Sequence, residues 1–390
     1  MKIVHIAPNA PYNEGWGYQE NLLPKHQAKL GHDVTLIITN REHYNGTVRD
    51  TKCVDFVMND GVRLIRRQYK RRFTFLPFFF NEFNVYDLLL EIKPDFIFFH
   101  GLLSRTIFQA IKYKKRYNKN CTIVQDNHLD YNIGCDTRYG LPFKQKILRL
   151  YYRLLNKESI KYVDKVYGVT PWRKSYAEDY FKIPTNKTDV LIMGADDEKI
   201  DFSHRESIRH DIRVKYGIKD SDFLIVTGGK IDKKKNIHVL MSACKNLNGV
   251  KLLVFGEVLD DIKDEFNDEL NRAGNIIYIG WVAGDKVYDY FIAADLVFFP
   301  GGHSVLWEQA CACKVPCVFK KWDGMDHVNN GGNSCFVEHV NEDSLREKVL
   351  DLVFTEKYFN MKRIAESERT DIYLYSNIAK KSLECLDNND

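Results

Sequence analysis

The chain alternates between short apolar runs and longer amphipathic stretches. The amphipathic stretch 20–30, ended by Gly31, has the pattern of a helix that lies between two strands. Such alternation predicts parallel sheets with helices on both faces. The apolar runs that we expect to form strands are residues 3–8, 34–38, 94–100, 122–128 and 165–170 in the first half, and 223–227, 251–255, 276–279, 296–299 and 316–319 in the second.

The strands fall into two sets, separated by a mostly polar stretch at residues 197–222. A length of 390 residues favours two domains. We therefore predict an α/β protein of two doubly wound, Rossmann-like domains, with the boundary near Met193–Asp196 and a cleft between them. Ligands of such sheets bind beyond the carboxyl ends of the strands, which places Gly15, Gly17, His100 and His128 on one functional rim.

Residues 298–319 have the pattern of a strand, a glycine turn, a helix and a second strand. Pro300-Gly301-Gly302 breaks the first apolar run, and we expect a helix to begin at His303-Ser304 with Ser304 as its N-cap. A helix start behind a glycine turn suits a phosphate, and Glu308, one turn further on, suits ribose hydroxyls. An ordinary strand-to-helix turn has the same pattern, so the spacing alone leaves both interpretations open.

Composition narrows the class of protein. The chain is 44% hydrophobic and 28% charged, as in ordinary globular proteins, and no apolar run is long enough to span a bilayer. Its first residues have the pattern of a strand and not of a signal peptide. Nine cysteines without a paired framework favour a reducing cytoplasm. Cys311, Cys313 and Cys317 fit small buried hydrophobic residues better than metal ligands.

Positive charge is unevenly distributed. The net charge is only +4, but residues 61–120 hold 13 Lys and Arg against 4 Asp and Glu, a local excess of +9. Basic residues at 63–72 precede several phenylalanines up to residue 83, and a second basic stretch, 143–165, has apolar residues at helical spacing. Both segments suit an anionic membrane surface, although solvated basic segments beside core residues fit equally. Binding of nucleic acid is less favoured, because no recognised motif accompanies the charge.

The order of motifs resembles that of retaining GT-B glycosyltransferases of family 4. Glu308-Gln309-Ala310 with Val315-Pro316 resembles the second half of the family's glutamate motif. The first half differs, because the family's earlier glutamate falls at Pro300 here and the loop is shorter. The other similar blocks are residues 15–20, 29–34, 93–100, 193–196, 229–236, 280–282 and 294–296, and a closing helix at 375–386.

The resemblance implies the domains and the site. It implies an acceptor-binding domain at 1–195, a nucleotide-sugar-binding domain at 196–370, and a C-terminal helix, 371–390, that returns to the first domain. It implies donor binding by Gly15, Gly17, Gly229, Gly302, His303, Ser304, Val305 and Glu308, with His303 as substitute for the missing glutamate. It implies catalytic roles for Lys230 and Lys235 at the leaving diphosphate, and for His128 in positioning and charge stabilisation.

With this resemblance, the sequence predicts a retaining glycosyltransferase that moves a sugar from a nucleoside-diphosphate sugar to a glycan or lipid-linked acceptor. A UDP-sugar is favoured over a GDP-sugar as the donor. We expect no metal or other cofactor, because no D-x-D motif lies at a strand end and Asp260-Asp261 is expected in a polar helix. The expected setting is surface polysaccharide synthesis in the cytoplasm, where the chain could bind peripherally to the inner face of the plasma membrane. Two alternatives stay open: a nucleotide-sugar epimerase on the same fold, and a degenerate protein that binds a nucleotide sugar without turnover.

Overall fold

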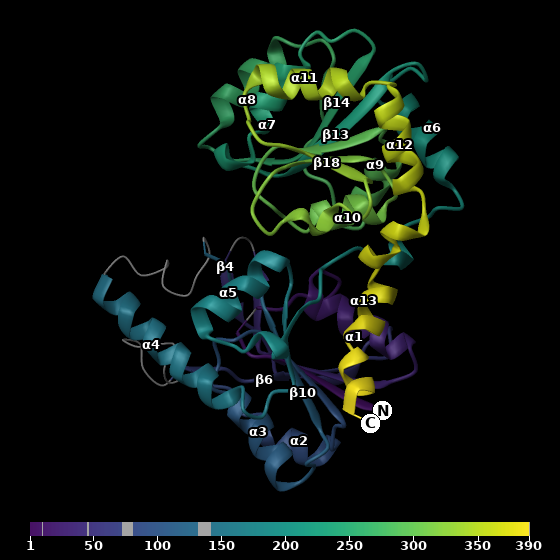
Figure 1. The fold of residues 1–390 in the computed structure, drawn as a ribbon. Helices are drawn as coiled ribbons and strands as arrows, with labels where there is room; N and C mark the ends of the chain where they lie inside the picture. Colours follow the sequence, from purple (N-terminus) through teal and green to yellow (C-terminus); the bar gives the residue numbers. More distant parts are fainter. Residues whose placement is uncertain (10, 45–46, 72–80, 132–141, 390) are drawn as a thin grey trace. The chain divides into compact units, whose positions relative to one another are not determined.

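The computed structural model describes residues 1–9, 11–44, 47–71, 81–131 and 142–389 (Figure 1). It separates into two compact units, Met1–Ile192 with Ile378–Asp390 (unit 1) and Met193–Asn377 (unit 2). The boundaries expected from the sequence follow residues 195 and 370. Among the described residues, no helix is both long and apolar enough to cross a bilayer.

Unit 1 contains an eight-stranded sheet in the order β12-β11-β10-β9-β1-β2-β6-β5, parallel except at its β5–β6 edge. The parallel pairing confirms the α/β prediction. The strands are β1 (Lys2–Ala7), β2 (Asp33–Thr39), β5 (Asp55–Val57), β6 (Arg63–Arg67), β9 (Phe96–Phe99), β10 (Thr122–Asn127), β11 (Lys165–Gly168) and β12 (Thr188–Val190). Two short hairpins stand apart from it, β3 (Arg41–Tyr44) with β4 (Thr47–Asp50) and β7 (Lys70–Arg71) with β8 (Asn81–Glu82).

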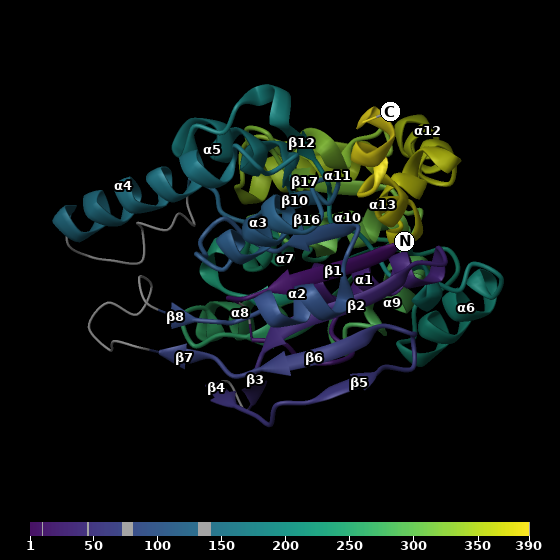
Figure 2. The ribbon, with the colours of Figure 1, turned by 90° about the horizontal axis from the view of Figure 1, so that it is seen from below.

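Helices cover both faces of this sheet (Figures 1 and 2). Four of them pack in one core with the sheet: α2 (Tyr86–Ile92), α3 (Ile107–Arg116), α4 (Pro142–Ser159) and α5 (Pro171–Phe181). On α1 (Gln19–Lys29), Gln27 Nε2 donates to Ser382 Oγ at 2.8 Å, just beyond the helix α13 (Tyr375–Lys381). The last residues of the chain, which include the short helix η6 (Glu384–Asn389), therefore complete unit 1.

Unit 2 has a six-stranded parallel sheet in the order β15-β14-β13-β16-β17-β18. Its strands are β13 (Phe223–Ile231), β14 (Val250–Val258), β15 (Ile276–Tyr278), β16 (Leu296–Phe299), β17 (Cys317–Lys320) and β18 (Ser334–Val337). Its helices are α6 (Arg205–Lys215), α7 (Ile237–Cys244), α8 (Lys263–Asn271), α9 (Val287–Ala293), α10 (Leu306–Ala312), α11 (Glu342–Leu352) and α12 (Glu356–Ala365). Short 3₁₀ helices are η1 (Thr185–Lys187) in unit 1 and η2 (Asp197–Lys199), η3 (Lys233–Lys235), η4 (Asp326–Val328) and η5 (Glu368–Tyr373) in unit 2.

Strands β13 and β14 are longer than the sequence predicts. Each has nine residues, and they continue in register through Gly228, Gly229 and Gly256. A Cβ atom on Gly256 would lie 1.8 Å from the Gly229 carbonyl oxygen, so the two backbones approach more closely than a side chain allows. The glycines therefore permit close pairing here instead of ending the strand.

Two other local expectations are wrong. Helix α10 begins at Leu306, Val305 takes the N-cap position, and no described side chain caps the helix, so Ser304 is not the N-cap. Asp260 and Asp261 are exposed, as expected, but they precede α8 instead of lying in a helix. Cys311, Cys313 and Cys317 are buried, which confirms their interpretation as small core residues.

Candidate functional site

The glycine turn of unit 2 is built against η3. A Cβ atom on Gly301 would lie 2.4 Å from the Cα atom of Lys235, so only glycine fits at 301. A Cβ atom on Gly302 would meet no described atom within 4 Å, so sterics do not require glycine there. The Lys235 ammonium donates to the Gly302 carbonyl at 2.7 Å, and burial lowers the pKa of Lys235. Lys235, one of the predicted catalytic residues, therefore lies at the turn.

Glu308 lies on α10, shortly after this turn. Its side chain is fully buried, and its Oε1 atom accepts hydrogen bonds from His303 Nε2 at 2.8 Å and from His327 Nε2 at 2.7 Å. Both imidazoles must then carry a proton on Nε2. Burial alone would raise the pKa of Glu308, but the two histidines outweigh burial and hold that pKa well below its ordinary value. Glu308 is thus a carboxylate fixed by two imidazoles.

The second oxygen of Glu308 is unused. Within the described residues, Oε2 has no hydrogen-bond partner although it is buried. Leaving a buried carboxylate oxygen without a donor is costly, so this atom is suited to accept a hydrogen bond from a ligand. The ligand atoms of His303, Glu308 and His327 all lie within 4.8 Å of one another, a spacing that a metal ion also accepts. The two short nitrogen-to-oxygen distances are, however, fully explained as hydrogen bonds.

A cavity of about 560 Å³ lies at the carboxyl ends of β14 and β15. It is lined by Gly256, Glu257, Val258, Lys263, Asn267, Tyr278 and Trp281. Lys230 is exposed and is paired in register with Glu257 on the neighbouring strand, so it stands at the margin of this cavity. Trp281 belongs to a block that resembles the family, Gly280-Trp281-Val282, but it was not among the predicted site residues; it is 73% exposed.

The remaining donor-binding predictions lie around these groups. Gly229 has φ +105°, and a Cβ atom there would approach Leu306 Cδ1 to 2.9 Å, so the end of β13 packs tightly against the start of α10. His303, Ser304 and Val305 form the segment that links the glycine turn to α10. Unit 2 therefore brings together the predicted residues from Gly229 to Glu308, whereas Gly15, Gly17 and His128 belong to unit 1.

Unit 1 carries its own buried polar centre at Asp126. The Asp126 side chain is fully buried, accepts from the Gly101 N–H at 2.6 Å, and lies 2.9 Å from His100 Nδ1. His128 Nε2 lies 3.4 Å from the same carboxylate, at ion-pair distance. Burial would raise the pKa of Asp126, but His128 and His100 hold that pKa well below its usual range. Asp126 is therefore a buried carboxylate shared by two histidines.

His128 is only partly covered. Its side chain is 36% exposed, although its Nε2 atom is buried. Burial alone would lower the pKa of His128, but the charge of Asp126 outweighs it, so the pKa of His128 is raised. His128 was among the predicted site residues, but Asp126 was not. A carboxylate near the carboxyl end of the buried strand β10 was the available signal, because buried charges are rare unless they are paired.

The polar chain continues from Asp126 into the interior. His100 Nε2 lies 3.1 Å from His5 Nδ1, and His5 Nε2 lies 2.7 Å from Gln27 Oε1. Because Gln27 donates from its amide to Ser382, its oxygen must accept from His5, which leaves His5 Nδ1 to accept from His100. Burial and the neighbouring His100 lower the pKa of His5 to about 3. His5 is therefore a neutral link in the chain.

This arrangement predicts acid sensitivity. In the unfolded chain His5 is protonated below pH 6.5, its ordinary pKa, whereas in the folded chain its pKa of about 3 keeps it neutral down to about pH 3. The contribution of His5 to the free energy of unfolding should therefore be fully present above pH 6.5. Between pH 6.5 and about pH 3 the free energy of unfolding should fall by about 1.4 kcal/mol for each unit that the pH is lowered. Denaturant unfolding at pH 7 and pH 5 should show a smaller loss for His5→Gln than for the wild type. Equal losses in both proteins would show that His5 does not carry the pH dependence.

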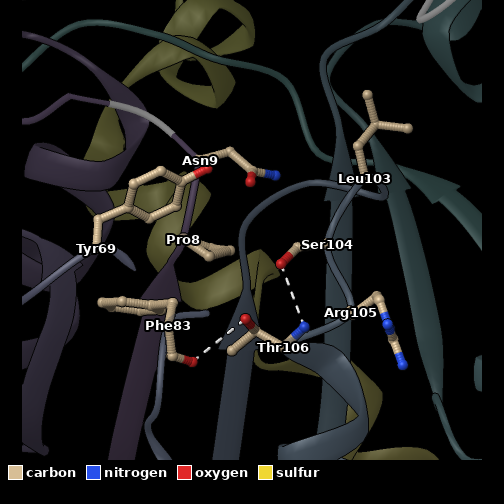
Figure 3. A pocket seen from close by; sticks show the side chains of 8 residues that line it. All are labelled: Pro8, Asn9, Tyr69, Phe83, Leu103, Ser104, Arg105 and Thr106. Atoms are coloured by element: carbon tan, nitrogen blue, oxygen red, sulfur yellow. Dashed lines mark hydrogen bonds between the residues drawn. The ribbon is translucent and has the colours of Figure 1, made fainter. Parts of the chain in front are cut away.

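The loops at the carboxyl ends of β1 and β9 enclose a small hollow in unit 1 (Figure 3). Its room is about 20 Å³, enough for about one water molecule. The Thr106 N–H donates to Ser104 Oγ at 3.2 Å, and the Thr106 hydroxyl donates to the Phe83 carbonyl at 3.4 Å. The hydroxyls of Ser104 and Thr106 therefore stabilise the conformation of the loop. Gly15, in the loop between β1 and α1, has φ +78°, and both Gly15 and Gly17 are exposed.

Comparisons with known proteins agree with this architecture. Residues 22–199 match the family model described as Glycosyltransferase Family 4, and residues 208–368 match that of Glycosyl transferases group 1. An uncharacterized glycosyltransferase of Methanocaldococcus jannaschii is 24% identical over 216 residues, which are 52% of this chain and 54% of that protein. The match thus spans about half the length of the curated relative.

Two solved structures show the same fold over nearly the whole chain. A glycosyltransferase from Rickettsia africae superposes with a TM-score of 0.70 at 16% identity and covers 99% of this chain and 98% of its own. Anabaena HepE in complex with UDP gives a TM-score of 0.69 at 15% identity and covers 100% of both chains. With both halves matched, the chain belongs to the GT-B glycosyltransferases of the family 4 type. This confirms the predicted family and fold.

Proposed function

We propose that the chain is a retaining glycosyltransferase that uses a nucleoside-diphosphate sugar, with UDP-sugars the first donors to test. The observation that carries the proposal is the buried Glu308 carboxylate, which keeps one oxygen unpartnered within the described residues beside a glycine turn that holds Lys235. A ribose hydroxyl can satisfy that oxygen. Support also comes from HepE, whose structures contain UDP and UDP-glucose.

Charge explains how unit 2 would assist the reaction. Cleavage of the bond between sugar and phosphate places negative charge on the leaving diphosphate, and cations aimed at it stabilise the transition state. Lys235, at the glycine turn, and Lys230, beside the cavity, are the cations we assign to this task. The proposal needs no metal ion. Retention of the sugar configuration can then proceed with the leaving phosphate as base, so that His128 positions the sugar and stabilises charge.

The acceptor is a glycan or lipid-linked saccharide in this proposal, within surface polysaccharide assembly at the inner face of the plasma membrane. Unit 1 would bind it at the carboxyl ends of its strands, where the loops carry His128 and Gly15. An epimerase on the same fold would interconvert the sugar without net transfer. A degenerate protein would bind the nucleotide sugar and leave it intact.

Removing either lysine should weaken binding of the nucleoside diphosphate. Lys235→Ala and Lys230→Ala each delete a charge-assisted contact of about 1.5–3 kcal/mol, so the dissociation constant for UDP should rise about tenfold or more. Lys234→Ala is the matched control, because Lys234 is exposed and lies in the same basic run. Calorimetric titration with UDP measures all three. If both test variants bind like the Lys234→Ala control, the diphosphate site lies elsewhere.

A further inference from the structure

Helix α4 has two apolar faces, and only one of them serves the fold. Leu148, Tyr152 and Leu155 are at most 6% exposed and pack in the core of unit 1. Asn156 adds a hydrogen bond from its amide to the Leu102 carbonyl at 3.0 Å. This inner face anchors α4. Figures 1 and 2 show the helix at the margin of unit 1, extending past the edge of the sheet.

The opposite side of α4 exposes a second apolar stripe. Ile147 is 46% exposed, Leu150 60% and Leu154 54%. The spacing of three and four residues aligns these side chains along the helix axis. Single exposed aliphatic side chains are common on protein surfaces, but an aligned stripe on one helix is typical of a surface that binds something.

A basic stripe runs beside the apolar one. Lys146, Arg149, Arg153 and Lys157 follow one another at spacings of three, four and four residues. Residues 142–157 contain five Lys and Arg and no Asp or Glu. Arg149 lies over the Tyr180 ring at 4.7 Å, whereas the other three form no ion pair within the described part of the chain.

We propose that this outer face of α4, the stripe Ile147, Leu150 and Leu154 with its basic neighbours, binds an anionic lipid surface. The aliphatic side chains would enter the boundary between headgroups and acyl chains, and the basic side chains would meet the lipid phosphates. The inference does not depend on the transferase activity. Binding of α4 to a lipid surface would, however, hold unit 1 at the membrane, where a lipid-linked acceptor is found.

Charge favours lipid over the other occupants of such a face. A second copy of the chain docked through the same face would set two basic stripes against each other, and like charges repel. A nucleic acid would match the charge but leave the aliphatic stripe in water. An anionic bilayer matches both stripes at once.

The other basic segment of the sequence does not offer such a surface in its described part. Arg63 pairs with Asp55 at 2.8 Å, and Arg67 pairs with Asp87 at 3.0 Å. Arg66 is buried and donates to the Tyr12 carbonyl, so it is not an exposed cation. Phe83 is buried too, and residues 72–80 lie outside the described residues. Of the two segments expected at a membrane, 63–83 and 143–165, only the second therefore offers such a surface in its described part, through α4.

Co-sedimentation of the full chain with vesicles tests the proposal. We expect the wild type to bind vesicles of equimolar phosphatidylcholine and phosphatidylglycerol. Its binding to vesicles of phosphatidylcholine alone should be at least tenfold weaker, and its binding to the anionic vesicles should weaken as the salt concentration is raised. The triple variant Ile147→Ser, Leu150→Ser, Leu154→Ser should lose at least tenfold in partitioning onto the anionic vesicles, with its melting temperature unchanged.

The matched control removes equally exposed apolar side chains from unit 2. Val214, Leu350 and Phe359 are 65%, 53% and 53% exposed, and their triple serine variant should bind vesicles like the wild type. The proposal is overturned if the wild type does not prefer anionic vesicles, or if the α4 variant binds as well as the control. A change in oligomeric state of the α4 variant, without any vesicle binding by the wild type, would assign the face to a second copy.

Discussion

Glu308→Gln is expected to weaken UDP binding by tenfold or more and to lower the free energy of unfolding. The variant keeps the shape of the side chain but removes the negative charge of the carboxylate, whose Oε1 atom accepts hydrogen bonds from His327 Nε2 at 2.7 Å and from His303 Nε2 at 2.8 Å. Hydrogen bonds to a charged group contribute about 1.5–3 kcal/mol, so both the contact with the ligand and the hydrogen bonds within the buried cluster should weaken. Calorimetric titration with UDP and chemical unfolding measure the two losses separately.

The control for this variant is Glu347→Gln, which changes an exposed carboxylate on α11 and should alter neither quantity. A large loss of stability with unchanged UDP affinity would make Glu308 a structural residue that holds His303 and His327. A loss of affinity without the stability loss would show that the two imidazoles contribute less to the fold than their distances indicate.

Asp126→Asn should reduce sugar transfer by about a hundredfold or more, with a smaller change in KM. Asp126 does not need to touch the sugar for this effect, because its charge raises the pKa of His128 and its oxygens hold His100 and the Gly101 N–H. We therefore regard Asp126 as a positioning residue. His128→Ala should lose activity to a similar degree.

A titration separates positioning from simple loss of fold. In the Asp126→Asn protein the pKa of His128 should be lower than in the wild type, because the neighbouring negative charge is gone. Nuclear magnetic resonance of the His128 ring measures this directly. Asp130→Asn changes a carboxylate that lies 3.5 Å from Arg173 and should leave the His128 titration in place. An unchanged pKa in the Asp126→Asn protein would contradict the assigned role.

The sequence predicts the fold best where apolar runs are bounded by breakers. Strand β16 (Leu296–Phe299) matches its predicted bounds, because a continuous apolar run meets Pro300 and two glycines. Strand β6 (Arg63–Arg67) was missed, because its three arginines mask the apolar pattern of a buried strand. Ser304 was misassigned because the residues that begin α10 are set by the packing of the glycine turn against Lys235, which is remote in sequence.

The candidate site was predictable where one segment carries it. His303 and Glu308 are five residues apart; the family motif points to Glu308, and His303 was selected as the substitute for the glutamate that the motif lacks here. His327 was missed, since it lies in η4 and reaches Glu308 only through the fold of unit 2. The chain from Asp126 to Gln27 was missed for the same reason, because parallel pairing of β1, β9 and β10 brings His5, His100 and Asp126 together.

The central claim is that unit 2 holds a nucleotide sugar for transfer. Its most direct test is release of nucleoside diphosphate from a panel of UDP-, GDP- and ADP-sugars by the wild type and by Glu308→Gln, with the sugar product followed by nuclear magnetic resonance. We predict slow release of the diphosphate from one donor by the wild type even without acceptor, retention of the anomeric configuration, and strong loss in the variant. Conversion of the donor into an epimer without release of diphosphate, or no consumption of any donor that the protein binds, would contradict the claim.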